Sequence, residues 1–209
     1  MLATGQNNEK EYYQASNATE GGGNLIITAR KQAVGGMQYT SARMNTQNKF
    51  SVKYGRIEAR VKVPNVAGMW PAFWMLGNSI SSIGWPKCGE IDIMEQANTN
   101  NTIYGTIHWA DVNGNHVQYG LTTTTSINDY HVYAVEWDAS SIRWYVDSNL
   151  YCTANIANNI NNTGAFNAGN FFIILNLAVG GDFTGGTAIN NAALPTQMLV
   201  DYVRVYRAS

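Results

Sequence analysis

Short β-type segments separated by turn residues recur along the chain and constrain its fold more than any other feature. Apolar or β-branched residues alternate with polar ones, and almost no stretch shows the 3.6-residue period of a helix. With 209 residues and 45% hydrophobic content, one core suffices, so we expect a single domain over residues 1–209. The pattern predicts an all-β sandwich with strands at residues 25–30, 37–44, 50–63, 70–76, 90–96, 102–109, 131–138, 142–147, 171–178 and 198–206.

One predicted strand carries three carboxylates, Glu90, Asp92 and Glu95, among apolar residues. Burial and the like charge of a neighbour both raise a carboxyl pKa, and folds hold such groups mainly where proton transfer or nucleophilic attack needs them. Strand side chains alternate between faces, so Glu90 and Asp92 share a face but Glu95 would point away. We therefore expect a β-bulge at Ile93 and Met94, which would return Glu95 to the carboxylate face.

Two glutamates flanking an aspartate on one face suit a retaining glycosidase. Such an enzyme needs a nucleophile and an acid/base whose carboxyl groups lie about 5–5.5 Å apart. The alternative is a solvated edge strand whose acids have no chemical role.

Composition narrows the classes of partner. The 13 Lys and Arg against 14 Asp and Glu give a net charge of −1, so no basic face for nucleic acid is expected. The polar surface must come from Asn, Thr, Ser and Gly, which suits a neutral polysaccharide. The count of two cysteines, Cys88 and Cys152, permits one disulfide, but they lack metal or redox spacing and are interpreted as inert thiols. Neither a membrane span nor a signal segment is present in the sequence, and we expect a monomer with no membrane partner.

Seven motifs together resemble glycoside hydrolase family 16, in particular its laminarinase (endo-β-1,3-glucanase) branch. They are Asn-Asn-Glu at 7–9, Tyr-Tyr at 12–13, Tyr-Gly-Arg-Ile-Glu-Ala-Arg at 54–60, Trp-Pro-Ala-Phe-Trp-Met-Leu-Gly at 70–77, Gly-Trp-Pro-Lys-Cys-Gly at 84–89, Gly-Thr-Ile-His-Trp at 105–109 and Leu-Val-Asp-Tyr-Val-Arg-Val-Tyr at 199–206.

The resemblance implies a β-jelly roll of two curved antiparallel sheets with a concave substrate cleft. Glu90 resembles the family's nucleophile, Asp92 its assisting carboxylate and Glu95 its acid/base, and Met94 places the chain in the bulged form seen in laminarinases. The implied activity is that of a secreted, retaining endo-β-1,3-glucanase that needs no cofactor, with mixed-linkage β-1,3-1,4-glucan as a second substrate. Two alternatives stay open: a non-catalytic glucan-binding module, and a relative acting on another polymer, as a galactan hydrolase or a transglycosylase.

The resemblance also places His108 near the acid/base, as a hydrogen-bonding or pKa-tuning partner. His116 and His131 lack such a context and are interpreted as structural. The other candidates are predicted to bind substrate, with a place in the core or a structural hydrogen bond as the alternative: Asn8, Arg43, Trp70, Trp74, Trp85 and Asn176.

Asp201 resembles the acidic ligand of a calcium ion that many family members hold on the convex side, where a turn equivalent to Gly23 supplies a carbonyl. The sequence begins just before Asn7, so the family's first strand, which supplies another carbonyl, is not expected here. A structural calcium is therefore uncertain on sequence grounds. We also expect unpaired backbone groups along an edge at the last strand, residues 198–206.

Overall fold

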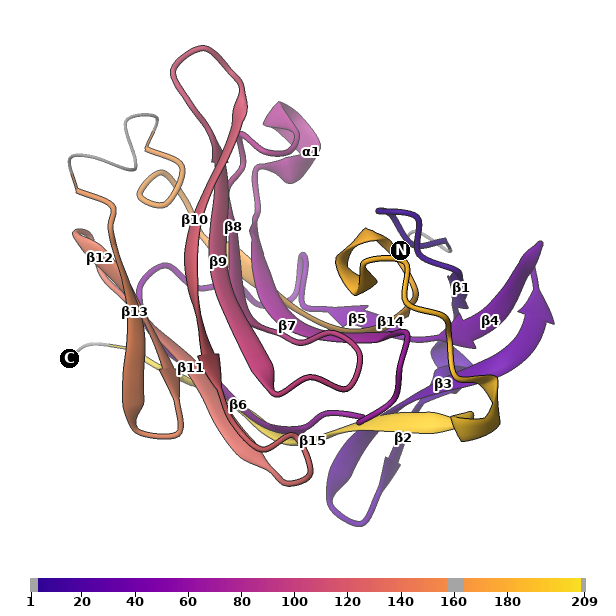
Figure 1. Cartoon of the computed structure of the whole chain (residues 1–209). Helices are drawn as coiled ribbons and strands as arrows, with labels where there is room; N and C mark the ends of the chain where they lie inside the picture. Colours follow the sequence, from indigo (N-terminus) through magenta and orange to yellow (C-terminus); the bar gives the residue numbers. More distant parts are fainter. Residues whose placement is uncertain (1–3, 158–163, 208–209) are drawn as a thin grey trace.

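Two sheets of antiparallel strands pack face to face in the computed structural model, which describes residues 4–157 and 164–207 (Figure 1). The six-stranded sheet has the order β10-β9-β8-β7-β14-β5. The nine-stranded sheet has the order β1-β4-β3-β15-β6-β11-β12-β13, with β2 also paired to β3. Among the described strands only β1 and β4 pair in parallel. The predicted all-β sandwich is confirmed.

The strands of the six-stranded sheet are β5 (Arg43–Asn45), β7 (Met69–Gly77), β8 (Glu90–Glu95), β9 (Thr102–Ala110), β10 (His116–Thr124) and β14 (Phe171–Val179). The other sheet contains β1 (Glu11–Tyr13), β2 (Ala18–Gly21), β3 (Asn24–Val34), β4 (Met37–Ser41), β6 (Gly55–Lys62), β11 (His131–Trp137), β12 (Ser141–Val146), β13 (Asn149–Asn155) and β15 (Thr196–Tyr206). The helical segments are short: α1 (Ile80–Ile83), η1 (Ala15–Asn17), η2 (Asp182–Thr184) and η3 (Asn191–Ala193). Within the described ranges, no helix has the length and apolar character needed to cross a bilayer.

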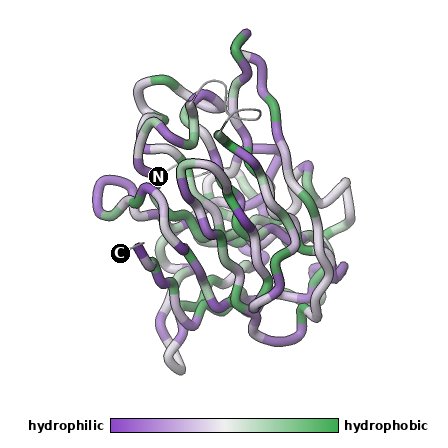
Figure 2. The backbone as a smooth tube through the Cα atoms, turned by 90° about the vertical axis from the view of Figure 1, so that its left-hand side faces the viewer, coloured by the Kyte–Doolittle hydropathy of each residue, from purple (hydrophilic) through white to green (hydrophobic). Residues whose placement is uncertain are grey.

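The core lies between the two sheets. Trp137, Trp144 and Tyr133 enter it from the nine-stranded sheet, and Phe73 and Ile91 meet them from the other. Apolar and polar residues alternate along many strands in Figure 2, as expected where one strand face is buried. Every residue of β14 is buried, in line with its continuously apolar run at 171–175.

Four strands that the sequence did not predict are short or polar: β1, β2, β10 and β13. Both β10 and β13 are edge strands, and several of their residues are polar and exposed. The strand predicted from residue 50 begins only at Gly55, because Tyr54 and Gly55 have φ angles of 64° and 116° that interrupt an extended chain. The strand predicted at 37–44 is divided into β4 and β5, which belong to different sheets.

The predicted bulge in β8 is confirmed. Along β7, Leu76 and Trp74 face Glu90 and Asp92, and the register then shifts so that Phe73 faces Met94 and Ala72 faces Glu95. The β9 register also shifts after Asp92, between Asp92 and Glu95. Ile93 and Met94 are both buried in the core, so the extra residue points inward while Glu95 returns to the face of Glu90 and Asp92.

The last strand is only partly an edge. Thr196–Val200 pairs with β3, and Leu199 and Val200 pair with β6 as well, so the predicted open edge is wrong for these two residues. Tyr202–Tyr206 pairs with β6 alone among the described strands. Val203 and Tyr206 are 37% and 47% exposed there, which agrees with an open edge along the second half.

Deleting Met94 should destabilise the protein more than the Met94→Ala variant does. The alanine variant keeps the register and should lose about 2–5 kcal/mol in free energy of unfolding, as large-to-small core changes do. The deletion reverses the faces of the residues that follow, so Glu95 would turn toward the apolar core. Urea unfolding of both variants measures the difference. A deletion variant as stable as Met94→Ala, with its cleft chemistry intact, would show that the bulge does not position Glu95.

Candidate active site

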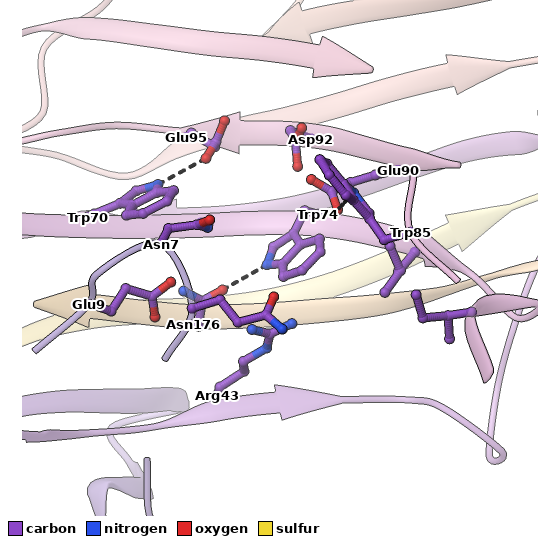
Figure 3. A pocket seen from close by; sticks show the side chains of 14 residues that line it. Asn7, Glu9, Arg43, Trp70, Trp74, Trp85, Glu90, Asp92, Glu95 and Asn176 are labelled. Carbon is purple, nitrogen blue, oxygen red and sulfur yellow. Dashed lines mark hydrogen bonds between the residues drawn. The ribbon is translucent and has the colours of Figure 1, made fainter. Parts of the chain in front are cut away.

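An open cavity of about 280 Å³ lies on the face of the six-stranded sheet that points away from the core (Figure 3). The bulge brings all three carboxylates of β8 to this face, where β7, β14 and β5 complete the floor. The residues that line the cavity are Gln6, Asn7, Glu9, Arg43, Trp70, Ala72, Trp74, Leu76, Ile80, Trp85, Glu90, Asp92, Glu95 and Asn176.

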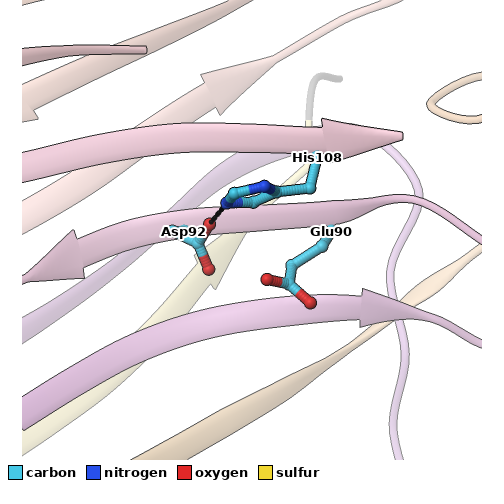
Figure 4. A group of neighbouring side chains, drawn as sticks. All are labelled: Glu90, Asp92 and His108. Atoms are coloured by element: carbon cyan, nitrogen blue, oxygen red, sulfur yellow. Dashed lines mark ion pairs between the residues drawn. The ribbon is translucent and has the colours of Figure 1, made fainter. Parts of the chain in front are cut away.

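Each carboxylate has its own polar neighbour. The indole Nε1–H of Trp85 donates to Glu90 Oε2 at 3.1 Å, and that of Trp70 donates to Glu95 Oε1 at 2.9 Å. His108, in the adjacent strand β9, places Nε2 3.1 Å from Asp92 Oδ2 (Figure 4). This last contact is an ion-pair approach without the alignment of a hydrogen bond. The structure therefore brings together all four residues predicted to be catalytic.

Burial shifts the acid–base behaviour of this cluster. Removal of the carboxyl groups from water is the largest cause that raises the pKa of Glu90, Asp92 and Glu95, each to about 8. The charge of Asp92 raises the pKa of both glutamates further, whereas His108 and the indole donors lower them. Because such neighbours do not titrate independently, the cluster loses its protons in successive steps. It therefore holds protons near neutral pH, as an acid catalyst must.

The predicted sugar-binding residues form a second linked group. Trp74 Nε1 donates to Asn176 Oδ1 at 2.7 Å, and the Arg43 guanidinium lies 4.7 Å from the centre of the Trp74 ring system. Asn176 therefore points into the cleft and also holds Trp74 in place. Of the two interpretations of Asn176, a substrate-binding group and a structural hydrogen bond, the structure is consistent with both. Trp85 is 48% exposed, and its surface is available to a sugar ring. One face of Trp70 is covered by Phe183 of η2, with ring centroids 5.0 Å apart.

The family model for glycosyl hydrolases family 16 matches residues 5–204. The chain belongs to this family. The laminarinase catalytic domain from Thermotoga maritima MSB8 superposes with a TM-score of 0.87 at 40% identity, over 97% of this chain and 85% of that one. The jelly-roll fold that the sequence predicted is thereby confirmed.

Two protein sequences are also similar to this chain over most of its length. A beta-glucanase of Rhodothermus marinus is 40% identical over 214 residues, which cover 96% of this chain and 75% of that protein. The clotting factor G alpha subunit of Tachypleus tridentatus is 43% identical over 202 residues. That match covers 96% of this chain, which spans only 30% of the length of the clotting-factor subunit.

Asn7, and not the predicted Asn8, lines the cleft of this family 16 domain. Asn8 donates through Nδ2 to Asp182 Oδ1 at 2.9 Å and lines a separate surface pocket. Both asparagines have positive φ angles, 54° and 60°, so the chain turns in the left-handed region. Sequence position alone does not tell which of two consecutive side chains in such a turn faces the cleft.

Sequence reasoning also missed a second buried carboxyl group pair, Glu9 and Glu11. Tyr13 donates its hydroxyl to Glu9 Oε2 at 2.8 Å, and the backbone N–H of Val179 donates to Glu11 Oε2 at 2.7 Å. Asn176 Nδ2 donates to Tyr13 Oη at 3.4 Å, which links this pair to the cleft floor. Burial, and next the interaction with Glu9, raise the pKa of Glu11 to about 8. The alternation of Glu9, Glu11 and Tyr13 on one strand face was the available signal.

Two groups of residues have the composition of a metal site. Glu90, Asp92 and His108 each bring one ligand atom within 4.8 Å of the others, and Trp85 already donates to Glu90 while His108 contacts Asp92. Asp201 follows the Val200–Leu25 pair, near the turn that contains Gly23. Its Oδ2 lies 2.7 Å from Arg60 Nη1, whose charge already compensates the carboxylate. The calcium site that the resemblance implied at Asp201 and Gly23 stays a prediction, and it would need further oxygen ligands beside this carboxylate.

Cys88 and Cys152 are both buried free thiols, as the sequence indicated. Burial raises the pKa of each to about 11, so the unreactive protonated form dominates at neutral pH.

Replacing Glu11 by Gln should weaken the dependence of stability on pH. The raised pKa means that folded Glu11 keeps its proton where the unfolded chain has lost it, between about pH 5 and 8. Stability conferred at low pH is therefore lost as the pH rises through this window. Glu11→Gln mimics the protonated acid at every pH. Between pH 6 and pH 9 the free energy of unfolding should decrease in both proteins, and the decrease should be smaller in Glu11→Gln than in wild type by at least about 1 kcal/mol.

Denaturant unfolding at the two pH values measures the effect, with the exposed Glu20→Gln as the matched control. Equal losses in wild type and Glu11→Gln would contradict the raised pKa.

Proposed function

We propose that this domain is a retaining endo-β-1,3-glucanase that hydrolyses internal bonds of β-1,3-glucan, with mixed-linkage β-1,3-1,4-glucan as a second substrate. One observation carries the proposal: the bulge in β8 aligns Glu90, Asp92 and Glu95 along the floor of an open cleft. The similarity to a protein named beta-glucanase and to a laminarinase catalytic domain supports this substrate class.

In the proposed mechanism Glu90 is the nucleophile and Glu95 the acid/base. A Glu90 oxygen attacks the anomeric carbon, the bond from that carbon to the glycosidic oxygen breaks, and the leaving oxygen takes the proton of Glu95. Glu95 then removes a proton from water as the water oxygen attacks the same carbon and releases Glu90. Asp92 lies between the two glutamates in sequence, and its ionisation changes with theirs because it raises the pKa of both.

Substrate binding is proposed to rest on aromatic surfaces and a small number of polar groups. Trp74 and Trp85 offer rings to the apolar faces of the sugars, and Arg43 and Asn176 offer hydrogen-bond donors beside Trp74. Asn7 and Glu9 add polar groups on the opposite wall. A neutral, hydroxyl-rich polymer matches such a cleft. We further propose that the domain acts as a secreted monomer and that its chemistry requires no cofactor.

The two alternatives predict different features. A glucan-binding module would need the aromatic surfaces, but it would have no use for three buried carboxyl groups, whose burial is unfavourable. A galactan hydrolase or transglycosylase would use the same carboxylates with a differently shaped cleft.

Incubation with laminarin, lichenan, agarose and xyloglucan separates these functions. We expect cleavage of laminarin to a ladder of oligosaccharides, slower cleavage of lichenan, and none of the other two polymers. Proton NMR of the earliest products should show the β-anomer first, since two displacements preserve the configuration. Binding of laminarin without cleavage would favour the non-catalytic module, and initial α-anomer would exclude a retaining mechanism.

Glu90→Gln should lower kcat on laminarin by at least about a thousandfold, because it removes the attacking oxygen anion while preserving shape. Binding of laminarin and the melting temperature should change little. In the smaller Glu90→Gly variant, added azide should partly restore bond cleavage and give a product of inverted configuration. Substantial activity in Glu90→Gln would refute the assignment of the nucleophile.

A further inference from the structure

His116 contacts two parts of the candidate active site at once, although its sequence context indicated a structural role. It begins strand β10 and pairs with Ala110 of β9, while His108 pairs with Gln118 two residues further along. The two histidines are therefore diagonal neighbours on one sheet face. Their rings lie 5.2 Å apart at an interplanar angle of 23°, and His116 Nε2 is 2.9 Å from His108 Nδ1.

The other contact of His116 is with Trp85. The ring centroids are 4.6 Å apart with an interplanar angle of 43°, so the imidazole lies against the indole. Trp85 nevertheless keeps 48% of its surface exposed. Its Nε1 donates to Glu90 at 3.1 Å, while His108 contacts Asp92 at 3.1 Å. His116 thus reaches Glu90 through Trp85 and Asp92 through His108.

We propose that His116 is a positioning residue that holds the Trp85 sugar platform and the His108–Asp92 pair in one fixed arrangement. The proposal rests on the proposed glucanase function, because it assigns Trp85 to substrate and Asp92 to catalysis. His116 itself touches no reacting atom.

Imidazole chemistry explains how His116 fixes His108. For His108 Nε2 to present an N–H to Asp92, Nδ1 must either accept a hydrogen bond from His116 or carry a proton and donate to it. Both states place one proton in the 2.9 Å contact between Nδ1 and Nε2, and a second proton there would repel the first. His116 therefore stabilises the orientation of His108 toward Asp92 in the neutral form and in the cationic form.

The charged groups around this pair come from three segments. Glu90 and Asp92 face it from β8, and Lys87, which precedes β8, packs near Gly114 of the β9–β10 turn. Asp111 in that turn accepts from the backbone N–H groups of Asn113 and Asn115. A cationic His108 lowers the pKa of Glu90 and Glu95, so a proton held by the pair favours the ionised carboxylates.

Two substitutions separate the two contacts of His116. His116→Phe keeps an aromatic ring against Trp85 but removes the nitrogen that faces His108. His116→Gln keeps an amide that reaches the position of Nε2 but removes the ring. His131→Gln is the matched control, since His131 lies in the other sheet and contacts Asp147 at 2.9 Å.

On laminarin, His116→Phe should lower kcat about tenfold with KM within about twofold, as the loss of one hydrogen bond to a charged group predicts. His116→Gln should instead raise KM, because the ring that supports Trp85 is lost, with kcat within about threefold. Unchanged kinetics in His116→Phe, or equal losses of kcat and melting temperature in both variants, would overturn the proposal.

A readout without substrate separates this proposal from the glucanase assignment. The chain has three histidines, so proton NMR can observe the imidazole N–H signals, with His131→Gln identifying those of one ring. The proton in the contact between His108 Nδ1 and His116 Nε2 should give a downfield N–H signal in wild type that is absent from His116→Phe. A wild-type protein that cuts no glucan would refute the proposed function alone, whereas a wild-type spectrum without this signal, or the same signal in His116→Phe, would refute the role of His116.

Discussion

One extra residue in β8 determines the face of the sheet on which Glu95 lies. Without it, a strand that starts with Glu90 facing the cleft would turn Glu95 into the core, where Ile91 and Ile93 already pack. The bulge adds an apolar side chain on the core side of the sheet and returns a carboxyl group to the cleft side. Because β7 follows the shifted register, Trp70 lies beside Glu95, whereas His108 of β9 pairs with Glu90 ahead of the bulge.

Burial of the carboxyl groups is unfavourable, and the surrounding polar groups offset it. Each glutamate of the cluster accepts from an indole, and Asp92 has His108 beside it. The same principle appears around β1, where Glu9, just before the strand, accepts from Tyr13 and Glu11 accepts from the backbone of β14. Since Asn176 of β14 also contacts both Tyr13 and Trp74, this region and the cleft floor belong to one hydrogen-bonded network.

Periodicity predicted the strands that bury an apolar face, and the spacing within residues 90–95 predicted the bulge. Periodicity did not predict strands whose formation depends on pairing with a neighbouring strand, such as the largely exposed edge strand β10. The role of His116 was missed for the same reason, because its contact with His108 depends on the register of β9 and β10, which the sequence alone does not reveal. Similarly, the left-handed turn at Asn7 and Asn8 reverses which side chain reaches the cleft, and no strand or helix period applies there.

The aromatic groups differ between the two ends of the carboxylate row. Beside Glu90, Trp85 is half exposed and is supported from one side by His116. Beside Glu95, Trp70 is covered by Phe183, which in turn contacts Tyr104 edge-on at 5.0 Å between ring centroids. In the proposed mechanism the sugar bound to Glu90 must stay through two displacements, whereas the part protonated by Glu95 must leave after the first. An open stacking surface on the Glu90 side and a covered one on the Glu95 side favour retention of the first part and release of the second.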